Sequence, residues 1–393
     1  MKKINVLVIG TGMYVCGRQT EGFGTIAPAI LEWSKTGKLG EVSIIGRSAK
    51  GVREARAKID ELKRMFGVNL PIRYFPQTGT DPVCYKRIVR DIGKPACAIV
   101  AVPDILHKEV AMASIGEGLH TLVVKPLVPT VDDALELIRL QDKKGVYCAV
   151  EFHKRYDQAN MKLRDVIGKR IIGDPLYFTI EFSQRRSMPA KIFKKWAGTT
   201  NVFQYLGIHY VDIIYFVTKA KPVRAMAIGQ KNWLSSKGVD TYDSVQSAIE
   251  WRMPSGKKFV SMVSTNWVDP EATSAMSDQT IKAVGTLGRF ESDQKRRGII
   301  LITDKGGIQE LNPYFCTSYG EHGKVTYRGY GIDSICRFLS DVANIENGSM
   351  TTDDLEGVRP TFRQAVVSTS VLEAVNMSLR RNGEWVGVKG VKV

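Results

Sequence analysis

The chain has 393 residues, of which 44% are hydrophobic and 24% charged. That composition is ordinary for a soluble protein with a buried core and two domains, and no apolar run is long enough to span a bilayer, so we expect no membrane partner. The formal net charge of +16 comes from dispersed basic residues without a nucleic-acid-binding motif, which argues against a nucleic-acid partner and favours a positive field that attracts an anionic small molecule.

The six cysteines are scattered singly, at positions 16, 84, 97, 148, 316 and 336. They form no Cys-x-x-Cys pair and no cluster with histidine. This usage is typical of a reducing compartment, so we expect a cytoplasmic protein with neither disulfides nor a metal site.

Short apolar runs alternate with helical patterns along the first 150 residues. The runs predict strands at 4–9, 41–45, 72–75, 96–102, 119–124 and 146–150. The helical patterns between them cover 28–37, 52–66, 85–92, 106–116 and 131–144. This alternation predicts an α/β, doubly wound parallel sheet with right-handed crossovers.

The pattern changes after about residue 150. Strands are predicted at 176–182, 223–229, 244–253 and 258–264 without regular helical crossovers, and a long helix at about 359–380 closes the chain. These features indicate an α+β domain with an open mixed, largely antiparallel sheet. We therefore expect one domain over residues 1–127 and a second, for substrate binding and oligomerisation, over 128–393.

A glycine turn follows the first predicted strand. Gly10-Thr11-Gly12-Met13 matches the first two glycines of Gly-x-Gly-x-x-Gly, while Val15 stands at the third glycine position. Such a pair often forms only a tight turn, but at the first strand of a βαβ series it indicates a dinucleotide phosphate site. Gly10, Thr11, Gly12 and Met13 are therefore candidate cofactor contacts.

The second strand is followed by Gly46-Arg47-Ser48 rather than by an acidic residue. A carboxylate there would bind the ribose 2′-hydroxyl of NAD, whereas a guanidinium and a hydroxyl suit a 2′-phosphate. Arg47 and Ser48 therefore favour NADP over NAD, although an exposed arginine is common at a strand end.

Two further strand ends carry candidate residues. Val102-Pro103 ends the fourth strand, and His107 nearby has the alternatives of contacting the cofactor or capping a helix. Lys125 stands between the fifth strand and Pro126. Because ligands bind at the carboxyl ends of strands in open α/β sheets, Lys125 is expected at the reacting end of the cofactor.

The second half of the chain adds polar groups on one predicted helix. At helical spacing, Tyr205, His209, Asp212 and Phe216 share a face, and three titratable groups in one row suit a site better than a core. The segment 151–156, which includes Arg155 and Tyr156, is another dense polar group, with a solvated loop as the plain alternative.

Taken in order, these motifs resemble the glucose–fructose oxidoreductase/inositol dehydrogenase/MocA family. The resemblance also includes Gly207-Ile208-His209-x-x-Asp212 and the turn Gly285 to Glu291. It implies a Rossmann domain, an open mixed sheet and NAD(P)-dependent oxidation or reduction of sugars and polyols. Two positions depart from the family: Val124 stands where the family has a glutamate before the lysine, and Tyr205 stands where it has an aspartate.

The combined expectation is hydride transfer between a nicotinamide and a hydroxyl or keto carbon of a sugar, cyclitol, nucleotide sugar or sugar acid. Lys125, His209 and Tyr205 would be catalytic, and Lys125, Arg155, Tyr156, His209 and Asp212 would contact substrate. The alternatives are a catalytically silent dinucleotide- and sugar-binding regulator and an NAD-dependent, redox-neutral glycosidase. We expect a homodimer or homotetramer.

Overall fold

A computed structural model describes residues 2–321 and 323–390. The chain forms two compact units. The first contains the residues up to Val128, Asp132–Tyr156 and Tyr314–Ala365. The second contains Pro129–Val131, Asp157–Pro313 and the residues from Val366 onward. The chain therefore passes between the units more than once.

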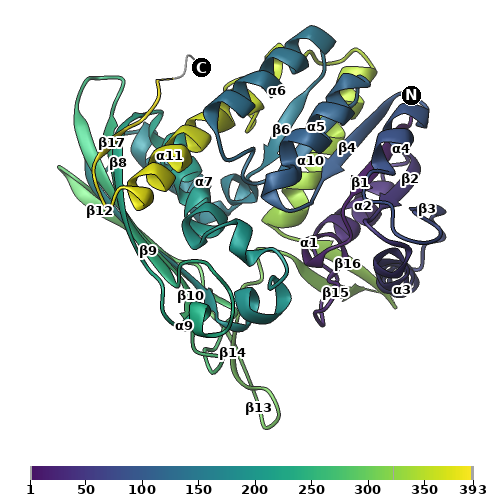
Figure 1. The fold of residues 1–393 in the computed structure, drawn as a ribbon, viewed down its shortest axis with the longest axis horizontal. Helices are drawn as coiled ribbons and strands as arrows, with labels where there is room; N and C mark the ends of the chain where they lie inside the picture. Colours follow the sequence, from purple (N-terminus) through teal and green to yellow (C-terminus); the bar gives the residue numbers. More distant parts are fainter. Residues whose placement is uncertain (1, 322, 391–393) are drawn as a thin grey trace. The chain divides into compact units, whose positions relative to one another are not determined.

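The first unit is built on a six-stranded parallel sheet with the order β3-β2-β1-β4-β5-β6 (Figure 1). Its strands are β1 (Ile4–Ile9), β2 (Leu39–Ile45), β3 (Ile72–Phe75), β4 (Ala96–Val100), β5 (His120–Val124) and β6 (Cys148–Glu151). Its helices are α1 (Met13–Cys16), α2 (Ile26–Ser34), α3 (Ala49–Phe66), α4 (Tyr85–Asp91), α5 (His107–Gly116), α6 (Val131–Lys144) and α10 (Tyr330–Glu346). The predicted doubly wound sheet is confirmed, and its carboxyl ends lie along one edge.

One face of this sheet is covered by α2, α3 and α10, which share a buried apolar cluster with the strands. The helix α10 contacts α2 through Trp33, whose Nε1 donates to Ser340 Oγ at 3.0 Å. It also contacts the sheet through Phe338, whose ring stacks on Tyr147 at 5.4 Å. The hairpin of β15 (Thr317–Glu321) and β16 (Lys324–Arg328) belongs to the same unit.

The compact units therefore differ from the domains expected from the sequence. Residues 132–156 and 314–365 pack with the first unit, whereas a boundary near 127 would assign both segments to the second domain. The reason is that β6 extends the parallel sheet and α10 supplies apolar surface to its core. The division of the chain into functional domains at residue 127 stays a prediction.

A buried ion pair ties α10 to the segment that follows it. Arg359 donates from Nε to Asp341 Oδ2 at 2.6 Å and from Nη2 to Oδ1 at 3.2 Å, and the Asp341 side chain is only 3% exposed. We expect Asp341→Asn to destabilise the first unit by about 3 kcal/mol, because the guanidinium would lose its charged partner. Urea unfolding combined with hydrogen exchange in α10 measures this.

The control for this change is Asp142→Asn. Asp142 pairs with Arg363 at the surface of the same unit, where both side chains are at least 40% exposed. An exposed pair contributes at most about 1 kcal/mol. Equal losses in the two variants would contradict a special role for the buried pair.

The second unit is built on a seven-stranded mixed sheet with the order β12-β11-β7-β10-β9-β8-β17. Its strands are β7 (Pro175–Arg185), β8 (Lys221–Gln230), β9 (Ser244–Arg252), β10 (Lys258–Asp269), β11 (Ser277–Gly285), β12 (Gly288–Asp293) and β17 (Val386–Gly387), with a separate hairpin of β13 (Ile299–Thr303) and β14 (Gly307–Leu311). Only the pair β7–β10 is parallel among these pairings. The prediction of a mixed, largely antiparallel sheet is confirmed.

The two faces of this sheet differ in character. Along β7, Phe178, Ile180 and Phe182 are buried, and the ring of Phe182 meets Tyr210 of α8 (Ile208–Thr218) edge-on at 5.9 Å. On the opposite face Tyr177 and Met262 are 41% and 47% exposed. The unit also contains α7 (Gln158–Gly168), α9 (Trp233–Ser236) and most of α11 (Phe362–Arg380).

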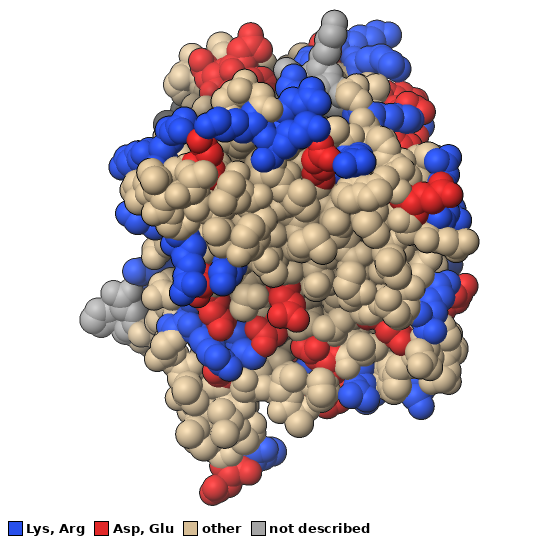
Figure 2. Space-filling view, turned by 90° about the vertical axis from the view of Figure 1, so that its left-hand side faces the viewer, with Lys and Arg blue, Asp and Glu red and all other residues tan. Residues whose placement is uncertain are grey.

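The surface charge is distributed rather than concentrated. On the face drawn in Figure 2, Lys and Arg are interspersed with Asp and Glu around a broad area with few charged side chains. Among the described residues, no helix is long and apolar enough to cross a membrane. All six cysteines are free thiols.

Candidate functional site

The glycine turn after β1 has two different steric requirements. Gly10 has φ +135°, and a Cβ there would lie 2.1 Å from the carbonyl oxygen of Ala101, so the turn needs glycine in order to fold beside β4. Gly12 has an extended backbone directly before α1, and a Cβ there would meet nothing within 4 Å. Open space above Gly12 is what the approach of a pyrophosphate to the backbone requires.

An arginine lies beside this turn. Arg18 Nη1 donates to Thr11 Oγ1 at 3.3 Å, and its Nε is 3.8 Å from Glu54 Oε2. Thr11 is buried, whereas Arg18 is half-buried. The guanidinium therefore places a positive charge next to the glycine turn, which suits an anion there.

Arg47 and Ser48 lie as predicted at the carboxyl end of β2. Arg47 is exposed. Ser48 is the N-cap of α3, and its Oγ accepts a hydrogen bond from the backbone N–H of Gly51 at 3.3 Å. The serine hydroxyl has a structural partner but keeps its own proton to donate, so the pair remains able to bind a phosphate.

His107 does not cap α5, and both of its ring nitrogens lie near backbone carbonyl oxygens. Its Nδ1 is 2.7 Å from the carbonyl oxygen of Pro126, and its Nε2 is 3.0 Å from that of Val102. The side chain is 1% exposed and does not cap α5. His107 therefore links the end of β4 to the end of β5 next to Lys125, and its contact with a cofactor stays a prediction.

Lys125 follows β5 at the same edge as the glycine turn, because β1, β4 and β5 are adjacent and parallel. Its side chain is 9% exposed. Burial lowers the pKa of Lys125 to about 8, and the negative charges of Asp104 and Glu151 oppose that effect. An amine with this pKa exchanges protons near neutral pH, as acid–base catalysis requires.

Sequence reasoning missed both of these acidic partners. Asp104 follows β4 and Glu151 ends β6, so they come from the two strands that flank β5. The sequence signal that could have found them is that three predicted parallel strands end at the same edge. In the structure, Glu151 pairs with Val124, the residue directly before Lys125.

The predicted substrate residues Arg155 and Tyr156 lie in the first unit, inside its packing. Arg155 is 3% exposed, and its Nη1 donates to Gln364 Oε1 at 2.6 Å. Burial raises the pKa of Tyr156 to about 12. Arg155 thus has a structural role that the dense polar sequence did not reveal.

Tyr205, His209 and Asp212 lie in the second unit at the start of the segment predicted to be helical. Residues Phe203–Gly207 form a π-helical turn before α8, so the spacing between Tyr205 and His209 is not that of a regular α-helix. His209 and Asp212 are buried. The ring of Tyr205 lies among those of Phe193, Trp196 and Trp267, at 5.0, 5.8 and 5.5 Å. This aromatic cluster was not foreseen.

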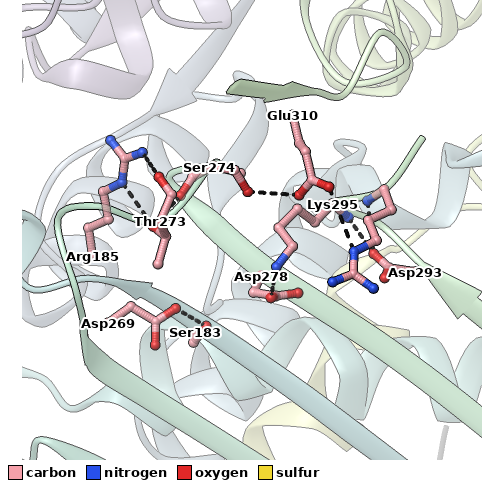
Figure 3. A network of polar contacts seen from close by, with 11 residues as sticks. Ser183, Arg185, Asp269, Thr273, Ser274, Asp278, Asp293, Lys295 and Glu310 are labelled. Atoms are coloured by element: carbon pink, nitrogen blue, oxygen red, sulfur yellow. Dashed lines mark hydrogen bonds and ion pairs between the residues drawn. The ribbon is translucent and has the colours of Figure 1, made fainter. Parts of the chain in front are cut away.

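Two arginines at the end of β7 contact other parts of the second unit. Figure 3 shows Arg185 beside Thr273, whose Oγ1 accepts from Arg185 Nε at 3.1 Å, and Ser274 donating to Glu310. Arg186 lies over the ring of Trp233 at 5.0 Å. The guanidinium group of Arg185 therefore holds the 269–276 loop.

Over residues 2–321 and 323–390, no three His, Cys, Asp or Glu side chains cluster so as to hold a metal ion. The carboxyl edge of the first unit carries the glycine turn, Arg47 and Lys125, with Arg18 next to the turn.

Two family profiles match the chain. The profile described as "Oxidoreductase family, NAD-binding Rossmann fold" matches residues 4–152, and the "GFO/IDH/MocA C-terminal domain" profile matches residues 160–291. The two matches follow one another in the order that the sequence motifs suggested, and they end at residue 291. The family resemblance is confirmed.

Individual relatives are distant. The 1,5-anhydro-D-fructose reductase of Ensifer adhaerens is 26% identical over 219 residues, which are 54% of this chain and 62% of that protein. The NADP(+)-dependent scyllo-inositol 2-dehydrogenase IolW of Bacillus subtilis is 27% identical over 135 residues, 34% of this chain and 38% of that protein. The chain thus spans less than two thirds of the length of these relatives.

Among solved structures, an inositol dehydrogenase homologue from Azotobacter vinelandii, complexed with NADH and myo-inositol, superimposes with a TM-score of 0.71. It is 17% identical, and the match covers 98% of each chain. This likeness establishes the fold over nearly the whole chain.

Proposed function

This chain belongs to the GFO/IDH/MocA oxidoreductase family with an NAD-binding Rossmann fold, and from that membership we propose that it is an NAD(P)-dependent sugar or cyclitol dehydrogenase or reductase. The observation that carries the proposal is Lys125, a buried amine whose pKa falls to about 8 at the edge of the sheet that carries the glycine turn. A buried lysine with a lowered pKa at a ligand-binding edge of a sheet is typical of a functional site and not of a residue that only fills the core.

Residues of the first unit bind the cofactor and transfer the proton in this proposal. Gly10, Thr11, Gly12 and Met13 bind the cofactor phosphates, while Val102 and Pro103 line the nicotinamide end. When bound, the nicotinamide accepts a hydride from a carbinol carbon or returns one to a carbonyl carbon. Lys125 hydrogen-bonds the reacting oxygen and takes or returns its proton, so that a hydride and a proton leave the alcohol together.

The residues singled out in the second unit keep their expected roles as proposals. His209 exchanges the proton, Tyr205 orients or relays it, and Asp212 contacts substrate. The ring cluster around Tyr205 supports an orienting role, since packed aromatic rings restrict the direction of its hydroxyl. Among the residues assigned to substrate, Arg155 fits least well because Gln364 already accepts from it.

NADP is the proposed cofactor, with NAD as the alternative. Arg47 is exposed at the end of β2, at the place where a 2′-phosphate would lie. We expect Arg47→Ala to raise KM for NADP about tenfold or more and to leave KM for NAD nearly unchanged, because it removes a charge-assisted hydrogen bond.

The matched control is Arg73→Ala, which removes an exposed arginine that pairs with Glu41 in the same unit. It should leave both KM values unchanged. Identical cofactor discrimination in the Arg47 variant and the unmodified protein would contradict the assignment of Arg47.

The substrate class and assembly are proposed more broadly. The net charge of +16 favours an anionic sugar derivative through long-range attraction. The uncovered face of the seven-stranded sheet, with Tyr177 and Met262 exposed, supports a homodimer or homotetramer formed through it.

A panel of cyclitols, sugars, sugar acids and nucleotide sugars, assayed with NADP(H) and NAD(H) by nicotinamide absorbance, tests the function. Turnover of one class is the expected result. Cofactor binding without turnover of any of them would indicate a silent binding protein, and product formation without net cofactor reduction would indicate redox-neutral glycosidase chemistry. Mass spectrometry of co-purified small molecules selects the first compounds to assay.

A further inference from the structure

A second buried charge lies beside Lys125. Glu151 is the last residue of β6, and it is 2% exposed. In the parallel pairing of β5 with β6 its partner is Val124, which directly precedes Lys125. A carboxylate so deeply buried requires hydrogen bonds and a nearby positive charge in order to stay ionised.

Three side chains from three other elements hold this carboxylate. His153 Nδ1 is 2.9 Å from Glu151 Oε2, and the hydroxyl of Ser334 in α10 donates to Oε1. The hydroxyl of Tyr14 in α1 lies 3.3 Å from His153 Nδ1. The pKa of Tyr14 is raised, first by burial and then by the charge of Glu151 and a hydrogen bond to it. The carboxylate therefore has a fixed orientation and not a free choice of rotamer.

The charges that face Lys125 come from the neighbouring strand ends. Asp104, after β4, and Glu151, at the end of β6, both act on the amine, while His107 of α5 holds the carbonyl oxygen of Pro126 next to it. Asp104 is 7% exposed and Glu151 2% exposed, so solvent screens neither charge fully. Glu151 is fixed by its hydrogen bonds with His153 and Ser334.

We propose that Glu151 is the positioning residue of Lys125: its carboxylate, held by His153 and Ser334, keeps the buried amine protonated and in place at the edge of the sheet. The acidic partner comes across the sheet from β6 and not from position 124, the residue before the lysine. This inference rests on the proposed function only for its catalytic consequence, because the electrostatic coupling exists whether or not the protein turns over a sugar.

The test is the titration of Lys125 itself. Trace labelling with acetic anhydride over a pH series, resolved by mass spectrometry of the Lys125 peptide, reports the deprotonated fraction without any substrate. We expect the midpoint, near pH 8 in the unmodified protein, to fall by about one pH unit or more in Glu151→Gln, because the opposite charge that favours the ammonium is lost.

The matched control is Glu346→Gln. Glu346 also pairs with a histidine in this unit, with Oε1 3.0 Å from His120 Nε2, but His120 is the first residue of β5, at the opposite end of that strand. Its loss should leave the Lys125 midpoint unchanged. If Glu151→Gln does not fold, Glu151→Asp retains the charge with a shorter reach and should lower the midpoint by a smaller amount. An unchanged midpoint in the folded variant overturns the proposal.

Activity separates this inference from the proposed function. With a substrate in hand, the pH at which log kcat/KM bends should move in Glu151→Gln by the same amount as the labelling midpoint. A shifted midpoint in a protein that turns over no substrate supports the positioning role and removes the proposed function. Normal turnover with both the midpoint and the bend unmoved leaves the function and overturns the role of Glu151.

Discussion

Lys125→Met should lower kcat on the identified substrate by about 100- to 10,000-fold, the range expected for losing a general acid–base group. Methionine keeps a similar length and fills the same buried space, so the fold should survive the change. Removing a buried charge also leaves cofactor affinity within a few fold, because the phosphate contacts belong to the glycine turn. Stopped-flow turnover and NADPH titration measure the two quantities separately.

The pH dependence of kcat/KM in the unmodified protein should show the titration of the Lys125 amine. Lys125 has a pKa lowered to about 8. In the oxidising direction the neutral amine accepts a proton, so log kcat/KM should rise with pH and level off above about 8. In the reducing direction the ammonium donates a proton, so log kcat/KM should fall above about 8. The bend should be absent in Lys125→Met.

Lys125→Arg provides the control for charge alone. A guanidinium keeps the positive charge but does not release a proton near neutral pH. Turnover as weak as that of Lys125→Met would indicate that proton exchange matters, whereas recovery by arginine would indicate that charge is sufficient. Near-normal turnover of the methionine variant would remove Lys125 from the mechanism.

The sequence was sufficient for the first sheet because its strands β1, β4, β5 and β6 are buried along almost their whole length. Predominantly apolar runs such as 4–9 and 96–102 end at glycine or proline, and the helices between them leave few alternative topologies. The predicted strands 4–9 and 72–75 match β1 and β3 residue for residue.

The sequence did not reveal which core the segment 314–365 would join. A helical pattern shows that a face is apolar, but not which surface will cover it. The partners of α10, Trp33 and Tyr147, lie about 300 and 190 residues earlier in the chain. Long-range contacts of this kind follow from the complete packing of the unit, which hydrophobic periodicity does not encode.

The candidate site divides in the same way. Gly10, Arg47 and Lys125 could be placed because each follows a strand, and parallel strands share one carboxyl edge. Roles that depend on hydrogen bonds to distant backbone could not be placed: His107 contacts two carbonyl oxygens, and Arg185 donates to the carbonyl oxygen of Thr273. For Glu151, the position beside Val124 follows from the strand register, but its hydrogen bonds to His153 and Ser334 do not.

Gly12→Val should abolish cofactor binding while leaving the protein folded. A Cβ at Gly12 meets no protein atom within 4 Å, and its φ of −80° and ψ of −170° suit a β-branched residue. The added methyl groups would instead occupy the space through which a pyrophosphate approaches the backbone. We expect NADPH affinity to fall by about 100-fold or more, a loss of about 3 kcal/mol, with an unchanged thermal midpoint; calorimetric titration and thermal unfolding measure these.

Gly10→Val is the matched comparison, two residues earlier in the same turn. Its Cβ would lie 2.1 Å from the Ala101 carbonyl oxygen, and its φ of +135° strains any side chain, so this variant should lose stability before it loses affinity. The two variants separate the reasons for which the turn requires glycine: Gly10 allows two strand ends to approach, and Gly12 leaves room for a ligand. Full NADPH affinity in Gly12→Val would mean that the glycine pair is only a turn and that the cofactor phosphates bind elsewhere.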